Sequence, residues 1–211
     1  MAELTDALNE ILSGQTGQIS RRIGADEERT RVAVQSAIPA LMAALSGEAD
    51  DPGLRNAIQQ DHDGSIIDQL SEYLEGSAQL SKRTTNGAGI LDHVLGDRQG
   101  EMAQALSAKS GLDLGSIMKL LPLLAPILMG MLGKKTSGSS GGGSSGGGFS
   151  FDDLGSILGG EREDARRANP DIGDVLDSFA KPRRSGSSRS DQGGGGIIDS
   201  IKDMLGGNRS R

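Results

Sequence analysis

The chain has 211 residues, of which 33 are glycine and four are aromatic, so we do not expect its whole length to form one core. It contains no cysteine, which excludes disulfides, thiolate metal sites and thiol catalysis. Residues 1–133 hold 10 Lys/Arg and 18 Asp/Glu, a net charge of −8, and such an acidic body repels the phosphate backbone of nucleic acids. We therefore expect no nucleic-acid partner.

The front of the chain, residues 1–133, shows helical spacing and none of the alternating pattern of strands, which predicts an all-α domain. Its first helix carries acidic residues, so we expect no secretory signal there. After a short second helix, Asp26 is placed to cap a third helix that runs to Leu45. Pro39 removes a backbone donor within that run, and we expect a kink or a break near Ile38.

Residues that typically begin or end helices divide the rest of this domain into short predicted helices. Asp51 and Pro52 have the order of a cap and a first helical residue, and a helix over residues 65–75 is expected to end at Gly76. A glycine-rich turn follows. Short helices are then predicted over residues 90–95 and 99–110, and a final pair over 114–121 and 122–132.

The most apolar run of the chain extends from Met118 to Lys134 and contains Pro122 and Pro126. Its uncharged stretch, residues 120–133, has 14 residues, whereas one membrane-spanning helix needs about 20. We therefore expect this run to pack in a core rather than to span a membrane. Since we expect neither a secretory signal nor a membrane-spanning helix, we expect a cytoplasmic protein.

The chain resembles itself at an offset of 87 residues, where residues that set caps, turns and kinks coincide. The matches include the pairs Gly24 and Gly111, Asp26 and Asp113, and Pro39 and Pro126. This predicts a duplicated helical unit over about residues 4–46 and 91–133. The repeat also favours the core interpretation of the apolar run, because an insertion device would explain only one of the two copies.

The composition changes abruptly after residue 133, where glycine and serine replace the apolar pattern. Such a segment buries too little to offset its conformational entropy, which predicts a disordered tail with short amphipathic helices. We divide it into a Gly/Ser linker (134–148), two helical islands (149–180), a basic then Gly-rich linker (181–196), a third island (197–206) and a terminus (207–211).

Each island places its apolar residues on one face but is shorter than the roughly 12 to 15 residues that an isolated helix needs in water. The islands therefore need a surface to fold against. Three alternatives are open for them: they bind another chain or a second copy in a groove, they dock back on the front domain, or they have no role. The candidate interaction residues are Phe149, Phe151, Leu154, Ile157, Leu158, Ile172, Val175, Leu176, Phe179, Ile197, Ile198, Ile201, Met204 and Leu205.

Patterns for catalysis or metal binding are weak. His62 and His93 each lie beside aspartate, but adjacent residues of a helix face apart. The preferred interpretations are a polar turn for His62 and a helix-surface or half-buried ring for His93. The glycine-rich turn before Ile90 has no strand before it and no P-loop lysine after it, and no G-x-S-x-G motif occurs within residues 1–133. We assign no catalytic, metal or cofactor-binding residue, and we expect no cofactor and no enzymatic activity.

Three motifs carry a resemblance to a known family: "GAGIL" at residues 87–91, "LSAKSGLD" at 106–113 and "LLPLLAP" at 120–126. With them, residues 1–133 resemble the bacterial YidB-like family, a domain of unknown function. The resemblance implies a small multi-helical orthogonal bundle without a recognised catalytic residue set or cofactor. It carries over no functional residue.

Three functions from different classes remain open. The first is a non-enzymatic interaction or scaffolding protein that self-associates or captures a protein partner through its tethered amphipathic helices. The second is a peripheral membrane or envelope-associated protein; a membrane surface is possible but not favoured, because the polar faces of the islands are acidic or mixed. The third is a metal-dependent enzyme, which would rest on His62 and His93 alone.

Overall fold

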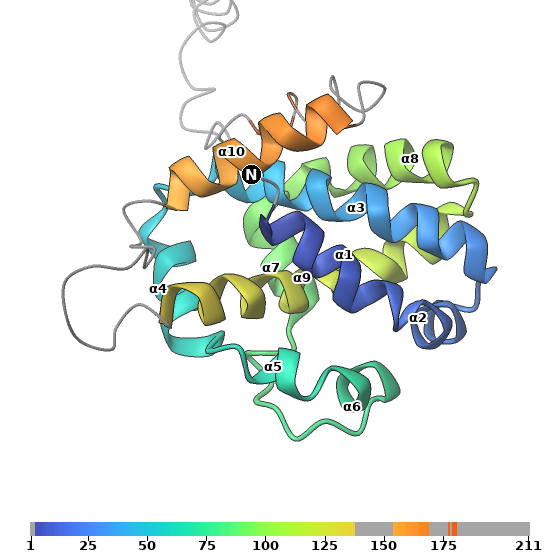
Figure 1. Cartoon of the computed structure of the whole chain (residues 1–211), viewed down its shortest axis with the longest axis horizontal. Coiled ribbons are helices and arrows are strands. Elements are labelled where there is room, and N and C mark those ends of the chain that lie inside the picture. The colour runs from blue at the N-terminus through green and yellow to red at the C-terminus, as the bar shows by residue number, and fades with distance from the viewer. Residues whose placement is uncertain (1–2, 138–153, 169–176, 178, 181–211) are drawn as a thin grey trace, which may run out of the picture.

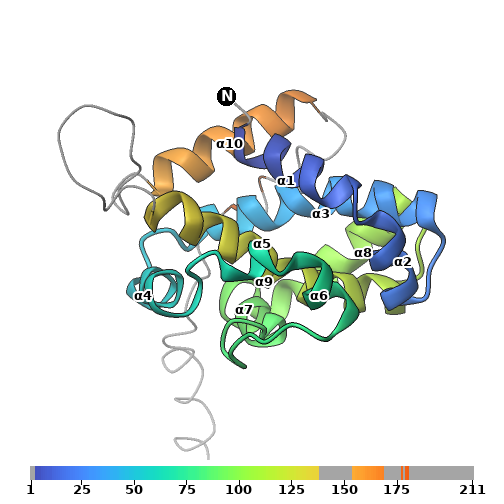
Figure 2. The ribbon, with the colours of Figure 1, turned by 60° about the horizontal axis from the view of Figure 1, so that its bottom comes forward.

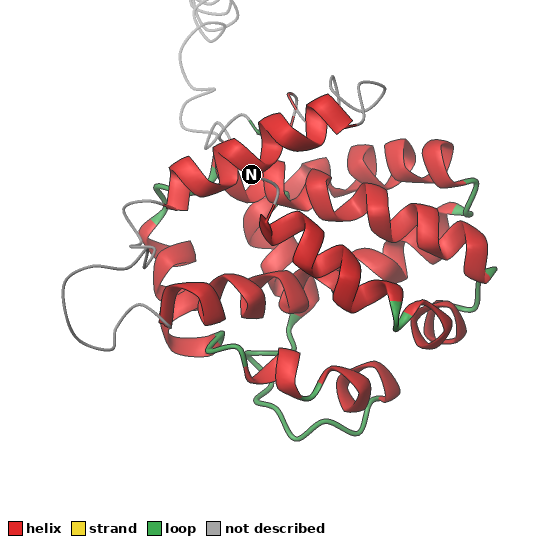
Figure 3. Cartoon of the chain, in the orientation of Figure 1, coloured by secondary structure: helices red, strands yellow, loops and turns green. Residues whose placement is uncertain are grey.

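The computed structural model describes residues 3–137, 154–168, 177, 179 and 180. Within these residues every regular element is a helix and no strand occurs, which confirms the all-α fold class (Figure 3). The elements are α1 (Glu3–Ser13), α2 (Thr16–Ile23), α3 (Glu27–Gly47), α4 (Pro52–Asp61), α5 (Ser65–Asp68), α6 (Leu70–Glu75), α7 (Gly87–Val94), the 3-10 turn η1 (Gly96–Arg98), α8 (Gln99–Ser110), α9 (Leu114–Ser137) and α10 (Leu154–Ala168).

Two long helices, α3 and α9, form the centre of the bundle, and shorter helices pack around them (Figure 1; Figure 2). Residues 36–45 of α3 and residues 123–133 of α9 are buried without interruption. A helix that is buried on every side needs neighbours on every side. Helices α1, α2, α8 and α10 contact α3, whereas α2, α4, α5, α7 and α8 contact α9, and the two long helices also touch each other.

Local polar signals set several helix ends, as the sequence predicts. Oδ1 of Asp26 accepts a hydrogen bond from Arg29 N at 3.0 Å, and Oδ1 of Asp51 accepts one from Leu54 N at 2.9 Å. Gly76 follows α6 with a φ of 84°, a left-handed conformation that favours glycine. These three predicted boundaries are confirmed.

The prolines do not divide the helices in which they lie. Of the kink or break expected near Ile38 the break does not occur, and the helix boundary predicted at Pro122 is wrong. Helix α3 continues through Pro39, and α9 continues through Pro122, where the sequence predicted the boundary between two helices. A proline inside a helix costs about 3 kcal/mol. Buried apolar residues flank both positions, and their packing in the core offsets that cost, so each long helix stays continuous.

The prediction of one helix over residues 65–75 is also wrong in one respect, because the helix is interrupted at Gln69, between α5 and α6. The Gln69 side chain accepts a hydrogen bond from Gln79 N at 3.2 Å and so holds the segment that leaves α6. This contact joins residues ten positions apart, and the apolar period of the segment contains no sign of it. Helix α7 likewise begins three residues before the predicted start at Ile90.

The two predicted repeat units contain the same hydrogen bonds at their glycine turns. Gly24 N donates to Ser20 O and Gly111 N donates to Ser107 O, each at 2.9 Å. Asp113 Oδ1 accepts from Ser116 N at 2.9 Å, which matches the cap made by Asp26. The shared bonds agree with the predicted offset of 87 residues. The duplication itself stays a prediction.

Two glycines let other segments approach α9 more closely than any side chain would allow. A Cβ added at Gly87 would lie 1.7 Å from Pro122 O, and one added at Gly133 would lie 1.5 Å from His62 O. Real Cβ atoms do not approach a carbonyl oxygen so closely. Gly87 therefore sets the distance between α7 and α9, and Gly133 sets the distance between the end of α4 and α9.

Replacing Gly87 by alanine is expected to lower the free energy of unfolding by about 2 kcal/mol or more, because α7 and α9 must move apart. Gly100→Ala in α8 is the matched control, since an added Cβ there meets nothing within 4 Å. That control should be neutral or more stable by up to about 1 kcal/mol. Urea denaturation of both variants measures the difference, and equal stabilities would contradict the close approach.

Candidate protein interaction site

Helix α10 lies along one side of the bundle, where it contacts α3 and α1 (Figure 1). Leu158, in the first half of α10, has an exposed fraction of 0%. Near the start of the helix, a Cβ added at Gly155 would lie 3.8 Å from Ala49 Cβ, which is ordinary van der Waals contact. The first helical island is therefore packed against the front domain of its own chain.

Phe179 marks a second place where the tail contacts the bundle. Its side chain is 3% exposed, and the guanidinium carbon of Arg98 lies 5.8 Å from the centre of its ring. Arg98 Nη1 also donates a hydrogen bond to Phe179 O at 3.4 Å. A cation over an aromatic face is attracted by the ring quadrupole, so Arg98 holds both the ring and the backbone of Phe179.

Arg98 is itself positioned by two other segments. Its Nη2 donates to Val94 O at the end of α7 at 3.5 Å and lies 4.0 Å from Glu48 Oε1, just after α3. Both side chains of this ion pair are largely buried, with exposed fractions of 21% and 13%. The guanidinium therefore joins the ends of α3 and α7 to the tail.

Ion pairs within the tail add little to its docking. Arg167 lies 3.5 Å from Glu163 one turn earlier in α10, and Arg166 lies 3.6 Å from Asp177. All four side chains are exposed by more than 40%, and pairs of this kind are worth about 0 to 1 kcal/mol. The burial of Leu158 and Phe179 therefore dominates the contact with the bundle.

The structure brings two of the predicted interaction residues, Leu158 and Phe179, into contact with the same bundle. Leu154 and Ile157 lie on α10 with Leu158. The remaining candidates lie outside the described residues: Phe149, Phe151, Ile172, Val175, Leu176, Ile197, Ile198, Ile201, Met204 and Leu205.

Sequence reasoning missed the bundle side of this contact, above all Arg98, Glu48 and Ala49. A single arginine in a turn between two short helices has no distinguishing pattern, and its ring contact spans 81 residues of sequence. The only available signal was the apolar face of the island itself. That face predicts that a helix needs a surface, but it does not say which surface.

The two histidines do not share a site. His62 is 2% exposed at the end of α4, and its Nδ1 has no hydrogen-bond partner within the described part of the chain. His93 is half exposed, with its Nε2 3.4 Å from Asp51 Oδ1. Among the described residues, no group of three or more His, Asp or Glu side chains is arranged to hold a metal ion. His62 lies in the connection between α4 and α5, as the interpretation of a polar turn expects, but its side chain is buried there.

One helix in the described ranges, α9, is long and apolar enough to cross a membrane, over Leu114–Lys135 with a mean hydropathy of 1.7. The sequence-based argument counted only 14 uncharged residues, but the continuous helix extends the apolar window through Lys119 and Pro122. In the bundle, 72% of that window is buried. A core helix of a folded domain has the same length and composition, and α9 occupies that position here.

Burial of His62 predicts a pH-dependent stability. Removal from water lowers the pKa of His62 from 6.5, although Asp61 and Asp63 act in the opposite direction. Below pH 6.5 the unfolded chain then binds a proton that the folded chain does not, so stability falls as the pH drops through 6.5 toward the folded-state pKa. His62→Gln should reduce the loss of unfolding free energy between pH 7.5 and 5.5.

Gln59→Ala is the control for this experiment, because this exposed residue of α4 carries no titratable group. It should keep the wild-type difference between the two pH values. Urea denaturation at both pH values provides the measurement. The account fails if His62→Gln loses as much stability on acidification as the wild-type chain.

Comparison with known protein families gives a match over most of the described bundle. The family described as "Bacterial protein of unknown function (DUF937)" matches residues 6–135, which is more than half of the chain and covers nearly all of α1 to α9. Comparisons with curated proteins and with solved structures gave no match. The resemblance to the YidB-like family agrees with this result, and α10 lies outside the matched region. The chain thus belongs to the DUF937 family of bacterial proteins of unknown function.

Proposed function

We propose that this chain is a non-enzymatic, cytoplasmic interaction protein, in which the DUF937 bundle holds an amphipathic helix on the surface of α3 and α1. In a single chain α10 occupies that surface. In an assembly the same surface takes the equivalent helix of a second copy, or a similar helix of a protein partner. No nucleic acid takes part, because the front of the chain has a net charge of −8.

The observation that carries the proposal is the complete burial of Leu158. Leu158 belongs to a helix outside the matched family region, and residues 138–153 separate that helix from α9. An isolated helix of 15 residues is marginal in water, so α10 depends on the surface against which it packs. An amphipathic helix that needs a surface and is carried on a separate segment of the chain is typical of proteins that bind a helix in a groove.

The energies fit reversible docking rather than a permanent core contact. Full burial of a leucine or phenylalanine side chain stabilises by about 1.5 to 3 kcal/mol each. The loss of conformational entropy when the helix docks opposes this gain. Because α10 belongs to the same chain as the surface, its effective concentration there is on the order of millimolar, and it occupies the surface first. A helix supplied by another molecule binds well only when the chain's own helix is displaced.

The membrane-associated alternative draws on the apolar length of α9. However, 72% of its apolar window is already buried in the bundle, and insertion would require the central helix to leave the core. Docking of α10 requires no such rearrangement. We therefore retain protein–protein interaction as the proposed function.

Leu158→Asp in the full-length chain should open the surface, because a carboxylate cannot be buried there without a partner. A fluorescent peptide of residues 154–180 should then bind this variant about 10-fold or more tightly than it binds the wild-type chain, whose surface is occupied. Ser156→Asp is the matched control, since Ser156 is exposed on the same helix. It should behave like the wild type.

Fluorescence anisotropy measures peptide binding, and thermal denaturation checks that the bundle of each variant stays folded. A peptide that itself carries Leu158→Asp should not bind. The proposal is contradicted if the Leu158→Asp chain and the wild-type chain bind the peptide equally, or if the Ser156→Asp chain gains binding to the same extent.

A further inference from the structure

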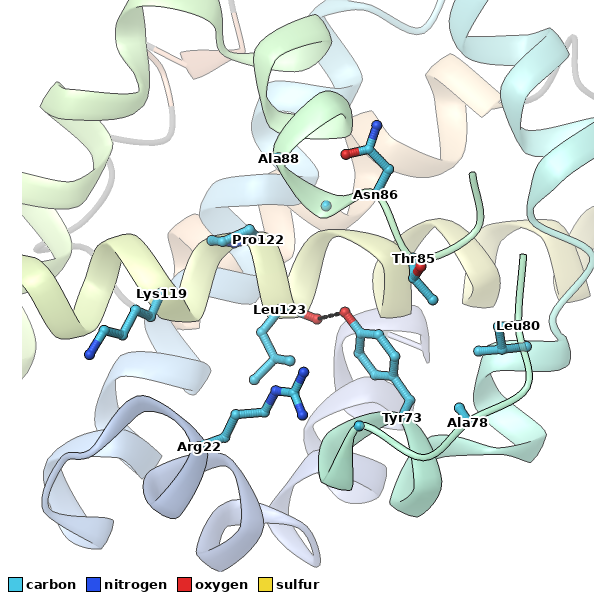
Figure 4. A pocket seen from close by; sticks show the side chains of 12 residues that line it. Arg22, Tyr73, Ala78, Leu80, Thr85, Asn86, Ala88, Lys119, Pro122 and Leu123 are labelled. Carbon is cyan, nitrogen blue, oxygen red and sulfur yellow. Dashed lines mark hydrogen bonds between the residues drawn. The ribbon is translucent and has the colours of Figure 1, made fainter. Parts of the chain in front are cut away.

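A cavity of about 480 Å³ lies between α2, α6, the start of α7 and the middle of α9, and none of its lining residues belongs to α10. Figure 4 shows Arg22 extending from α2 toward Leu123 and the Tyr73 ring, with Thr85 and Asn86 on the segment that leads into α7 and Lys119 farther along α9. The floor is partly apolar, through Leu123 and its neighbours. The cavity is large enough for a small organic molecule.

Arg22 and Tyr73 are held in place at this cavity. Arg22 Nη1 donates to Leu74 O at 2.8 Å, and the Tyr73 hydroxyl donates to Leu123 O at 3.2 Å. A guanidinium has five N–H donors, and Leu74 O is the one acceptor that the described part of the chain supplies to it. Most of the donors of a positioned arginine are therefore left for a ligand.

The charges around the cavity are unbalanced. Arg22 and Lys119 line it, none of the lining residues is acidic, and neither cation has an ion-pair partner among the described residues. Tyr73 adds no negative charge, because burial raises the pKa of its hydroxyl to about 12 and keeps it neutral. This is an uncompensated pair of cations in a domain whose net charge is −8.

We infer that this cavity binds a small organic oxyanion, a phosphate or a carboxylate attached to a compact body. The planar fork of Arg22 pairs with two oxygens of the anion, which is the arrangement that arginine offers to carboxylates and phosphates. The body of the ligand rests on Leu123 and the Tyr73 ring. Lys119, at the edge, attracts the anion without a fixed contact. The inference does not depend on the proposed role of α10.

The test titrates the full-length chain with phenyl phosphate, benzoate and inorganic phosphate at constant ionic strength, followed by amide NMR. Phenyl phosphate or benzoate should shift the amides of Gly76, Gly87 and Ala88 with saturation, because these residues line the cavity. Whichever of the two binds more tightly identifies the preferred oxyanion. Inorganic phosphate should bind more weakly than phenyl phosphate, because it cannot cover the apolar floor.

Arg22→Gln should weaken the tighter ligand about 10-fold or more. Arg21→Gln is the matched control, because it removes the same charge from a neighbouring residue that is also exposed but lies outside the cavity, and it should change affinity less than about 2-fold. Lys119→Gln, at an exposed position, should weaken binding about 3-fold. This variant keeps the test decisive if Arg22→Gln is unstable. Equal losses in the Arg21 and Arg22 variants, or the absence of saturable shifts, would overturn the inference.

Discussion

Burial of residues 36–45 of α3 and residues 123–133 of α9 is the constraint on which the other elements depend. Both helices contain proline, and both stay continuous because the surrounding helices cover the residues on either side. That cover requires very short distances between backbones, which Gly87 and Gly133 permit. The need to cover the two long helices also explains the arrangement of the short helices. Each of these covers part of α3 or α9: α1, α2, α4, α5, α7 and α8.

The tail takes part in the same constraint. Helix α3 is buried on all sides over residues 36–45, and α10 is one of the helices that cover it, although α10 lies outside the matched family region. A bundle whose central helix is partly covered by a tethered segment has a surface that another helix can occupy. The proposed interaction is therefore stabilised by the same apolar burial that holds α3 in the core. The oxyanion cavity lies elsewhere, beside α6 and α7, and relies on charge instead of apolar burial.

How far the sequence predicts this structure depends on the range of each signal. Asp26, Asp51 and Gly76 act within one turn of helix, and their positions could be predicted. The continuity of α3 and α9 could not, because Pro39 and Pro122 are destabilising locally and are tolerated only through contacts with distant segments. The apolar face of α10 indicated a docking helix. Its receptor could not be predicted, since the contact between Arg98 and Phe179 leaves no pattern in either segment.

The most direct test of the central claim is a disulfide between α10 and the bundle. The chain has no cysteine, and a Cβ at position 155 would lie 3.8 Å from Ala49 Cβ, which suits a disulfide. Mild oxidation of the Ala49→Cys, Gly155→Cys double variant should give a cross-linked monomer at low protein concentration and disulfide-linked dimers at high concentration, as exchange of α10 between copies requires. Two free thiols at every concentration would contradict the docking of α10 on the bundle, and cross-linked monomers alone would contradict its exchange between copies.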